Sequence, residues 1–166
     1  MNKAVFFDRD GVLNKEIGDY VCKIEDFQLL PDAVECIVMA KENGFKVFII
    51  TNQGGIDKKL YSHQDLKSFH NIITDACAQK GISIDEIYYC PHHPIVGNCL
   101  CRKPGSLMIE KAIAKYQIDS QKSIMFGDTD RDMEAAEACN VLGIRIQPNS
   151  DKISLLKKEI QRINNI

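Results

Sequence analysis

The chain has little of what marks nucleic-acid-binding, secreted or membrane-spanning proteins. Aromatic residues make up only 7% of its 166 residues, and the formal net charge is −2 with no block of like charges. This composition does not indicate a nucleic-acid partner or a strongly charged one. No apolar run approaches the length of a membrane span, and the N-terminus has no signal-peptide pattern. We therefore expect a soluble cytoplasmic protein.

Length and the absence of internal divisions limit the architecture. A chain of 166 residues is long enough for one domain with its own core and too short for two independent ones. No repeat, low-complexity segment or linker divides it. We expect a single domain over residues 1–166. Because no helical pattern has a strongly apolar exposed face, we also expect a monomer.

Apolar runs alternate with helical patterns along the chain, which is typical of a parallel sheet covered by helices. The strands are predicted at residues 4–7, 46–50, 84–89, 123–126 and 141–146. The helices are predicted at residues 31–43, 62–81, 106–116, 131–139 and from 150 onward. The predicted fold class is α/β, a three-layer α/β/α Rossmann-like arrangement with a central, mainly parallel sheet.

Polar segments follow the apolar runs at four places. Asp8 and Asp10 come directly after the first strand, and Gly11 supplies a tight turn. By themselves these aspartates could form no more than a polar turn. The other three segments are Thr51-Asn52-Gln53-Gly54-Gly55, Arg102-Lys103-Pro104 and Gly127-Asp128-Thr129-Asp130-Arg131-Asp132. Ligands bind at the carboxyl edge of such sheets, so we expect the four segments to meet there.

Taken together, these segments have the chemistry of a phosphate site. Aspartates can hold Mg²⁺, which prefers oxygen ligands and keeps waters that a phosphate can replace. The Thr51 hydroxyl and the glycine-rich backbone after it offer neutral donors, and Lys103 offers a cation. Other roles remain open. Thr51 could cap a turn, Asp132 could be the acid at a helix start, and Lys103 alone would be an ordinary surface charge.

The order of the segments resembles that of the haloacid dehalogenase-like phosphatases. The four motifs of that family match, in order, Asp8-x-Asp10, Thr51, Lys103 and Gly127-Asp128-x-x-x-Asp132. The resemblance covers nearly the whole chain. It implies that Asp8 attacks phosphorus to form an aspartyl-phosphate. It also implies that Asp10 protonates the leaving oxygen and later activates water.

The same resemblance implies a catalytic Mg²⁺. Its ligands would be the carboxylates of Asp8 and Asp128 and the backbone carbonyl of Asp10, with Asp132 further from the metal. Thr51 and Lys103 would hold the phosphoryl oxygens.

The cysteines fall into two groups. Seven is an odd number, and a disulfide framework is not expected in a cytoplasmic chain. Four are scattered and are predicted to be ordinary buried thiols, namely Cys22, Cys36, Cys77 and Cys139. The other three lie in the segment 90–101 together with a histidine.

That segment contains the ligand pairs Cys90-x-His92 and Cys99-x-Cys101. Three cysteines and one histidine are sufficient for a closed tetrahedral Zn²⁺ site, which would be structural. A loop of free thiols is the alternative, and His93 could replace His92. Because Arg102 and Lys103 follow directly, zinc would fix the backbone that presents both cations.

The Cys/His segment narrows the resemblance to the branch that contains heptose-bisphosphate phosphatases and histidinol-phosphate phosphatases. It implies removal of the C7 phosphate of D-glycero-D-manno-heptose 1,7-bisphosphate, in the synthesis of nucleotide-activated heptose. The first alternative is histidinol-phosphate phosphatase, because the short spacing from His92 to Cys99 resembles that group. Thr129 differs from the basic residue usual in this branch, and Arg131 could compensate. A non-catalytic scaffold is a third alternative, against which Asp8 and Asp10 argue.

Substrate selection is expected to come from loops. The stretch between Asn14 and Pro31 is too short for an inserted cap domain. The residues expected along a sugar-phosphate substrate are Glu16, Asp19, Tyr20, Asn52, Gln53, Gly54 and Arg102. Of these, Arg102 is predicted to bind the sugar's remaining phosphate, since a guanidinium can bond to it through two donors.

Overall fold

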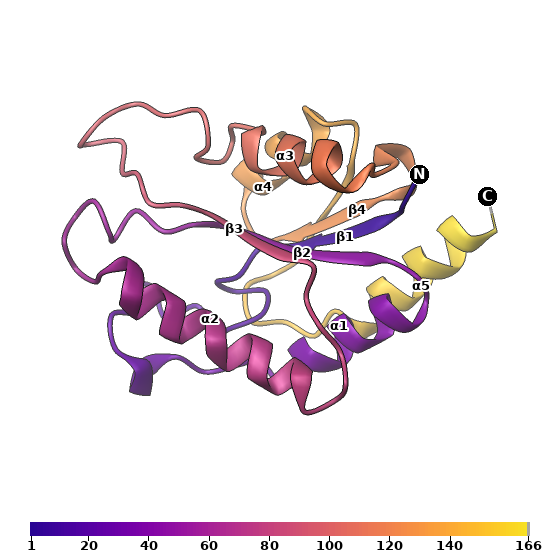
Figure 1. Cartoon of the computed structure of the whole chain (residues 1–166), viewed down its shortest axis with the longest axis horizontal. Helices are drawn as coiled ribbons and strands as arrows, with labels where there is room; N and C mark the ends of the chain where they lie inside the picture. The colour runs from indigo at the N-terminus through magenta and orange to yellow at the C-terminus, as the bar shows by residue number, and fades with distance from the viewer. Residues whose placement is uncertain (166) are drawn as a thin grey trace.

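A five-stranded parallel sheet forms the centre of the molecule (Figure 1). The computed structural model describes residues 1–165. Strand β1 (Ala4–Phe7) lies in the middle, β2 (Lys46–Asn52) and β3 (Glu86–Cys90) lie on one side, and β4 (Ile124–Gly127) and β5 (Leu142–Arg145) lie on the other. All four strand pairings are parallel. The sheet predicted as mainly parallel is thus parallel throughout the described residues.

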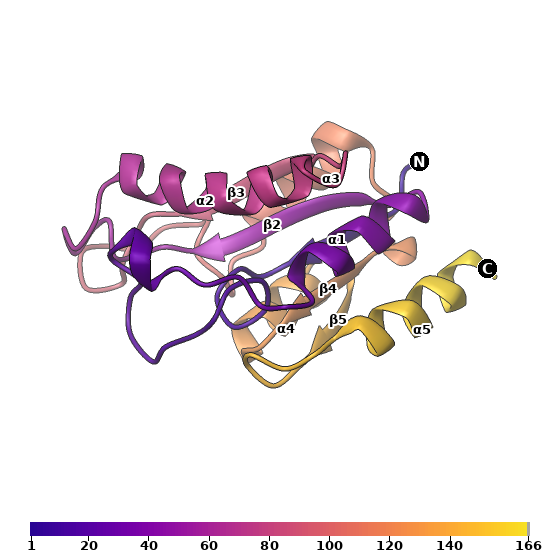
Figure 2. The same cartoon turned by 90° about the horizontal axis from the view of Figure 1, so that it is seen from below.

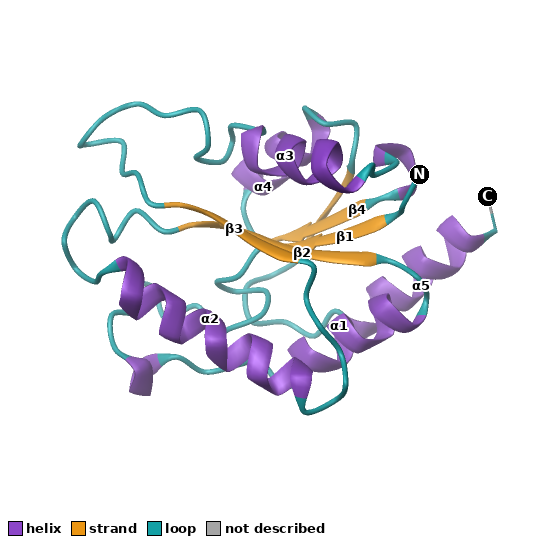
Figure 3. Cartoon of the chain, viewed as in Figure 1, coloured by secondary structure: helices purple, strands orange, loops and turns teal. Residues whose placement is uncertain are grey.

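Helices cover both faces of this sheet (Figure 3). Helices α1 (Ala33–Glu42), α2 (His63–Ala78) and α5 (Ile153–Asn164) pack on one face, and α3 (Leu107–Tyr116) and α4 (Asp130–Glu137) pack on the other. Seen from below, α1 lies between α2 and α5 (Figure 2). The predicted three-layer α/β/α fold is confirmed. Between β1 and α1 the chain forms only a loop with one short 3-10 helix at Ile24–Asp26, so no cap domain is inserted there.

Alternation along the strands divides the core in two. In β1, Val5 and Phe7 point to the layer of α1, α2 and α5, whereas Ala4 and Phe6 point to the layer of α3 and α4. This is the two-residue period of a strand that is buried on both faces. Phe6 stacks on Phe48 of β2 with ring centroids 5.3 Å apart. This packing holds the central strands together and so fixes the carboxyl edge of the sheet, from which the polar loops emerge.

Several predicted boundaries shift by a few residues. Strand β2 was expected to end at Ile50 and instead runs to Asn52, because Thr51 and Asn52 pair with Tyr89 and Cys90 of β3. Helix α2 begins after Ser62 as predicted. The Ser62 hydroxyl accepts from the Asp65 N–H, and the Asp65 carboxylate accepts from the Ser62 N–H in return. A second 3-10 helix, Ser120–Lys122, was not predicted.

A buried ion pair between Asp32 and Lys152 links the start of α1 to the start of α5. Lys152 has no exposed surface, and its Nζ lies 2.8 and 2.9 Å from the two carboxylate oxygens of Asp32. The backbone N–H of Lys152 also donates to Asp32 Oδ2 at 2.9 Å. The start of α5 is thereby joined to the start of α1. None of the helices in the described part of the chain is long and apolar enough to cross a membrane.

Candidate active site and metal cluster

The four polar segments meet at the carboxyl edge of the sheet, as predicted. Asp8 follows β1 and its N–H donates to the Phe126 carbonyl of β4 at 2.9 Å, while Asn52 ends β2 and Asp128 follows β4. Between them lies a cavity of about 130 Å³, called here the reaction cavity. It is lined by Asp8, Asp10, Glu16, Asn52, Arg102, Lys103, Asp128, Thr129, Arg131 and Asp132.

Lys103 is the buried cation of this cavity, with only 2% of its surface exposed. Its Nζ lies 2.8 Å from Asp8 Oδ1 and 2.5 Å from Asp132 Oδ1, and it donates to the Ile50 carbonyl at 2.7 Å. Burial disfavours the charged ammonium, but the two carboxylates outweigh that effect and raise the pKa of Lys103. The lysine therefore stays charged beside Asp8.

Asn52 holds the backbone of Lys103. The Lys103 N–H donates to Asn52 Oδ1 and the Lys103 carbonyl accepts from Asn52 Nδ2, both at 3.0 Å. Arg102, the residue before, donates from Nη1 to the His92 carbonyl at 3.1 Å. The segment that carries both cations is thus tied to β2 on one side and to the Cys/His segment on the other.

Asp8, Asp128 and Asp132 bring carboxylate oxygens within 4.8 Å of one another. Burial raises the pKa of Asp8 to about 7, although Lys103 acts in the opposite direction. Burial and the neighbouring Asp132 raise the pKa of Asp128 to about 6. Carboxylates that lie this close together repel one another when they are ionised, and a bound cation would offset that repulsion. The donor set therefore fits Mg²⁺. Both oxygens of Asp132 already bond, to Lys103 and to Thr129, whereas Asp8 bonds to Lys103 through Oδ1 alone. Asp8 Oδ2 and Asp128 are therefore left to face a metal.

Gly11 allows the first loop to approach Asp128. Its φ is +77°, and a Cβ at this position would lie 2.5 Å from Asp128 Oδ2. Any side chain at residue 11 would therefore displace the Asp128 carboxylate or the turn that carries Asp10.

The carboxylate of Asp10 belongs to a separate network. It accepts hydrogen bonds from Arg9 Nη2 at 2.7 Å, from Asn14 Nδ2 at 3.0 Å and from Gln53 Nε2 at 2.8 Å. Burial alone would raise the pKa of Asp10, but Arg9 and the two amides lower it below its ordinary value. The two aspartates of the first loop therefore have different surroundings, which suits them to different roles.

Gln53 connects Asp10 to residues further along the chain. Its Nε2 also donates to Thr51 Oγ1 at 2.8 Å, and its Oε1 accepts from the Tyr61 hydroxyl at 2.6 Å. Gly55 is required beside it, since a Cβ there would lie 2.3 Å from the Tyr61 ring. Thr51 is buried and lies in this network rather than among the residues that line the reaction cavity.

A second cavity of about 170 Å³, the acidic side cavity, adjoins the reaction cavity. It contains most of the residues predicted to lie along the substrate, and its lining is Arg9, Asp10, Glu16, Asp19, Tyr20, Val21, Asn52, Gln53 and Tyr61. Gly54 does not line it. A Cβ on Gly54 would lie 3.2 Å from Arg102 Nη1, so this glycine makes room for the arginine.

Sequence reasoning missed four residues that support these cavities. Arg9, Asn14 and Tyr61 hold Asp10 or Gln53, as described above. Asn149 exchanges two hydrogen bonds with the backbone of Glu16, at 2.7 and 3.0 Å, and its N–H donates to the Gly11 carbonyl at 2.8 Å. An arginine between two aspartates after a buried strand was a usable signal. Asn149 lies too far along the chain for a local pattern to reveal it.

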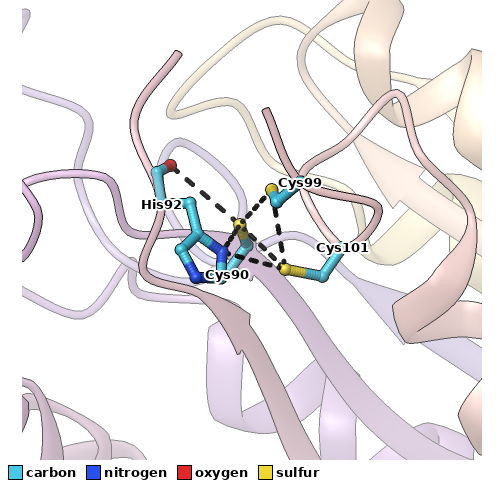
Figure 4. A group of neighbouring side chains, drawn as sticks. All are labelled: Cys90, His92, Cys99 and Cys101. Carbon is cyan, nitrogen blue, oxygen red and sulfur yellow. Dashed lines mark hydrogen bonds between the residues drawn. The ribbon is translucent and has the colours of Figure 1, made fainter. Parts of the chain in front are cut away.

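The Cys/His segment forms a tight cluster, with all four side chains pointing toward one another (Figure 4). Cys90 Sγ lies 3.5 Å from Cys99 Sγ and 3.2 Å from Cys101 Sγ, and Cys99 Sγ lies 3.7 Å from Cys101 Sγ. His92 Nδ1 lies 3.5 Å from Cys90 Sγ and 3.3 Å from Cys101 Sγ. Metal–sulfur bonds of about 2.3 Å in a tetrahedron place sulfurs roughly 3.8 Å apart, so the donors fit Zn²⁺.

His93 lies outside this cluster, and its Nδ1 accepts from the Ile95 N–H at 3.2 Å. The structure thus brings His92 to the thiols, not its neighbour. Of the four scattered cysteines, Cys36, Cys77 and Cys139 are buried free thiols as predicted. The prediction was wrong for Cys22, a free thiol that is only half-buried because it lies in the surface loop between β1 and α1.

Comparison with known proteins agrees with this geometry. A family model described as haloacid dehalogenase-like hydrolase matches residues 14–140. The chain belongs to this family of hydrolases. Relatives that are named as phosphatases indicate that it is a phosphatase.

D-glycero-alpha-D-manno-heptose-1,7-bisphosphate 7-phosphatase of Photorhabdus laumondii is 37% identical over 84% of this chain and 79% of its own. D-glycero-beta-D-manno-heptose-1,7-bisphosphate 7-phosphatase of Haemophilus influenzae is 36% identical over 85% of this chain and 79% of its own. Among solved structures, D,D-heptose 1,7-bisphosphate phosphatase from B. bronchiseptica, complexed with magnesium and phosphate, superposes with a TM-score of 0.83. It shares 30% identity and covers 93% of this chain and 86% of its own.

Proposed function

We propose that this protein is a Mg²⁺-dependent phosphatase that removes the C7 phosphate from D-glycero-D-manno-heptose 1,7-bisphosphate. The observation that carries the proposal is the reaction cavity itself, in which Asp8 lies 2.8 Å from the buried Lys103 and shares an oxygen cluster with Asp128. The heptose is suggested by relatives that bear this name over more than four fifths of the chain. Those two relatives are named for opposite anomers, so the proposal covers both anomers.

In the first step, Asp8 attacks phosphorus, an Asp8–phosphorus bond forms and the bond to the sugar oxygen breaks. That oxygen takes a proton from Asp10. Arg9 and the two amides favour the ionised Asp10 in the free protein, so the proton must be taken up with the substrate, whose negatively charged phosphate raises the pKa of Asp10. In the second step water attacks phosphorus and gives its proton to Asp10, so that phosphate leaves and both aspartates return to their starting forms. Arg9, Asn14 and Gln53 stabilise the ionised Asp10 that accepts this proton.

Lys103 supports both steps by holding positive charge beside Asp8, where the phosphoryl oxygens would lie. Asp132 holds the side chain of Lys103, and Asn52 holds its backbone. Bound Mg²⁺, with Asp8, Asp128 and the Asp10 carbonyl as its proposed ligands, would offset negative charge between Asp8 and the phosphoryl group.

We assign the Cys90, His92, Cys99 and Cys101 cluster to structural Zn²⁺. Four protein donors complete a tetrahedron and leave no position for water, so the metal would not take part in the reaction. Its effect would be to fix the backbone of Arg102 and Lys103, which follow Cys101 directly.

The test is a comparison of kcat/KM for the α and β heptose bisphosphates and for histidinol phosphate, with one preparation in Mg²⁺. We expect a heptose bisphosphate to be preferred by at least about tenfold, roughly 1.4 kcal/mol in transition-state binding. A tenfold preference for histidinol phosphate would replace the substrate assignment with the alternative. No release from any of the three would overturn the proposed function.

A further inference from the structure

Two cavities of opposite charge open off the reaction cavity. The acidic side cavity shares Asp10, Glu16 and Asn52 with it. On the other side lies a cavity of about 230 Å³, the basic side cavity, which shares Arg102, Lys103 and Arg131 with the reaction cavity. The Cys/His segment and Pro104 form the rest of its wall. A substrate whose phosphate lies at Asp8 can therefore extend toward either charge.

The acidic side cavity does not suit a second phosphate. Glu16 and Asp19 would repel it, and the one arginine in the lining, Arg9, is 1% exposed and already paired with Asp10. Carboxylate and amide oxygens are good acceptors for hydroxyl groups, so this side suits the polyol part of a sugar.

The basic side cavity has the opposite character. Its Lys103 ammonium is committed to Asp8 and Asp132, and Arg102 gives one donor to the His92 carbonyl. Arg131 makes no ion pair and no side-chain hydrogen bond with any residue that the structure describes. By contrast, Arg9, Arg145 and Arg162 are each paired with an acid. An exposed, unpaired guanidinium at the junction of two cavities is available to an anion.

Thr129, two residues earlier, does not offer a competing donor. Its hydroxyl donates to Asp132 Oδ2 at 2.6 Å as part of the start of α4. Among the cavity-lining residues that the structure describes, the cationic donors left free on this side are therefore those of the two guanidiniums, Arg102 and Arg131.

We propose that Arg131 binds the distal phosphate of the bisphosphate substrate, together with Arg102, in the basic side cavity. Arg131 is then the residue that makes the enzyme prefer bisphosphates over monophosphates. This inference rests on the proposed function and specifies the direction in which the substrate lies.

The experiment compares heptose 1,7-bisphosphate with heptose 7-phosphate, which has the same reacting group and lacks the distal phosphate. The readout is the ratio of the two kcat/KM values in the unaltered protein, Arg131→Gln, Arg131→Lys and Arg162→Gln. We expect the ratio to fall by about tenfold to a hundredfold in Arg131→Gln, mainly through KM for the bisphosphate, because a charge-assisted hydrogen bond is lost. Arg131→Lys should recover part of the ratio by restoring the charge, and Arg162→Gln should leave it unchanged.

Binding gives a second readout that does not depend on turnover. In an Asp8→Asn background, Arg131→Gln should weaken the Kd for the bisphosphate measured by calorimetry and leave the Kd for the monophosphate within about twofold. An unchanged ratio in Arg131→Gln, in a protein that does prefer the bisphosphate, would overturn the inference and leave the proposed function standing. A failure of the unaltered protein to hydrolyse either ester would overturn the proposed function first.

Discussion

The reaction cavity and the Cys/His cluster are both groups of potential metal ligands, yet they are assembled in opposite ways. The reaction cavity takes its side chains from segments at residues 8–10, 52, 102–103 and 128–132, which only the whole sheet brings together. The cluster takes all of its donors from the single segment 90–101. One site is a product of the fold, and the other is a product of local spacing.

Their internal contacts differ accordingly. In the reaction cavity Lys103 and Asp132 already balance each other, so much of the site is held by protein contacts alone. In the cluster the three thiols and His92 make their polar contacts mainly with one another, and most of the segment around them is exposed. We infer that the first site is set before a metal binds, whereas the second depends on its metal for its shape.

The largest effect should come from the reaction cavity. Replacing Asp8 by Asn removes the proposed nucleophile while keeping its size, and phosphate release should fall by at least about a thousandfold. Steady-state release of phosphate from the bisphosphate measures this. Asp75→Asn, an exposed acid on α2, is the matched control and should keep full activity. Substantial release by Asp8→Asn would remove Asp8 from its assigned role.

An intermediate effect should come from the cluster. In Cys99→Ser combined with Cys101→Ser, zinc content should fall to near zero and kcat/KM should fall by about tenfold to a hundredfold, because the backbone of Arg102 and Lys103 is less well placed. Metal analysis and kinetics on the same sample measure both quantities. Cys22→Ser, which changes a thiol outside the cluster, should retain zinc and activity. Full activity in a folded, zinc-free double variant would show that the two sites are independent.

The smallest effect should come from the support of Asp10. Tyr61→Phe removes the hydroxyl that donates to Gln53 Oε1, and this should lower the free energy of unfolding by about 1 kcal/mol. If the hydrogen bond from Tyr61 to Gln53 also positions Asp10, kcat should fall by roughly fivefold as well.

The control for Tyr61→Phe is Tyr116→Phe, which loses a hydroxyl bond to the Asp85 carbonyl on the far side of the sheet. It should lose similar stability in urea unfolding and no kcat. Equal kcat values for the two variants would mean that the Tyr61 bond stabilises the fold without positioning Asp10.

The parts of the molecule that follow local rules could be predicted from the sequence. The buried strands β1 and β4 are continuous apolar runs, and Ser62 and Asp65 have the spacing of a helix start. The Cys/His cluster was predictable for the same reason, since its ligands lie close together along the chain. The meeting of Asp8 and Asp128 followed from their common position at strand ends, whereas Lys103 reaches them from the loop beyond the Cys/His segment.

Hydrogen-bond partners at the site could not be predicted in this way. Asn52 was expected along the substrate and lines both cavities, but the sequence did not indicate that its amide also holds the Lys103 backbone, a contact made possible only by the packing of distant loops. Asn149 and Tyr61 likewise hold other loops through hydrogen bonds, Asn149 to the backbone of Glu16 and Tyr61 to Gln53. The sequence did not indicate that the Thr51 hydroxyl accepts from Gln53 Nε2, a bond that leaves the hydroxyl hydrogen available to a phosphoryl oxygen. Local spacing identifies chemistry, whereas tertiary packing decides which donors remain free.

The Asp32–Lys152 pair predicts where this domain can be cut. The family match ends at residue 140, before β5 and α5, so a fragment cut at that limit would retain Asp32 and lose its cation. It would also uncover the core surface that Leu156, Ile160 and Ile163 now cover. The uncovered apolar surface should make such a fragment aggregate. We therefore expect the smallest autonomous folding unit to include the C-terminal helix, although the segment matched by the family model does not.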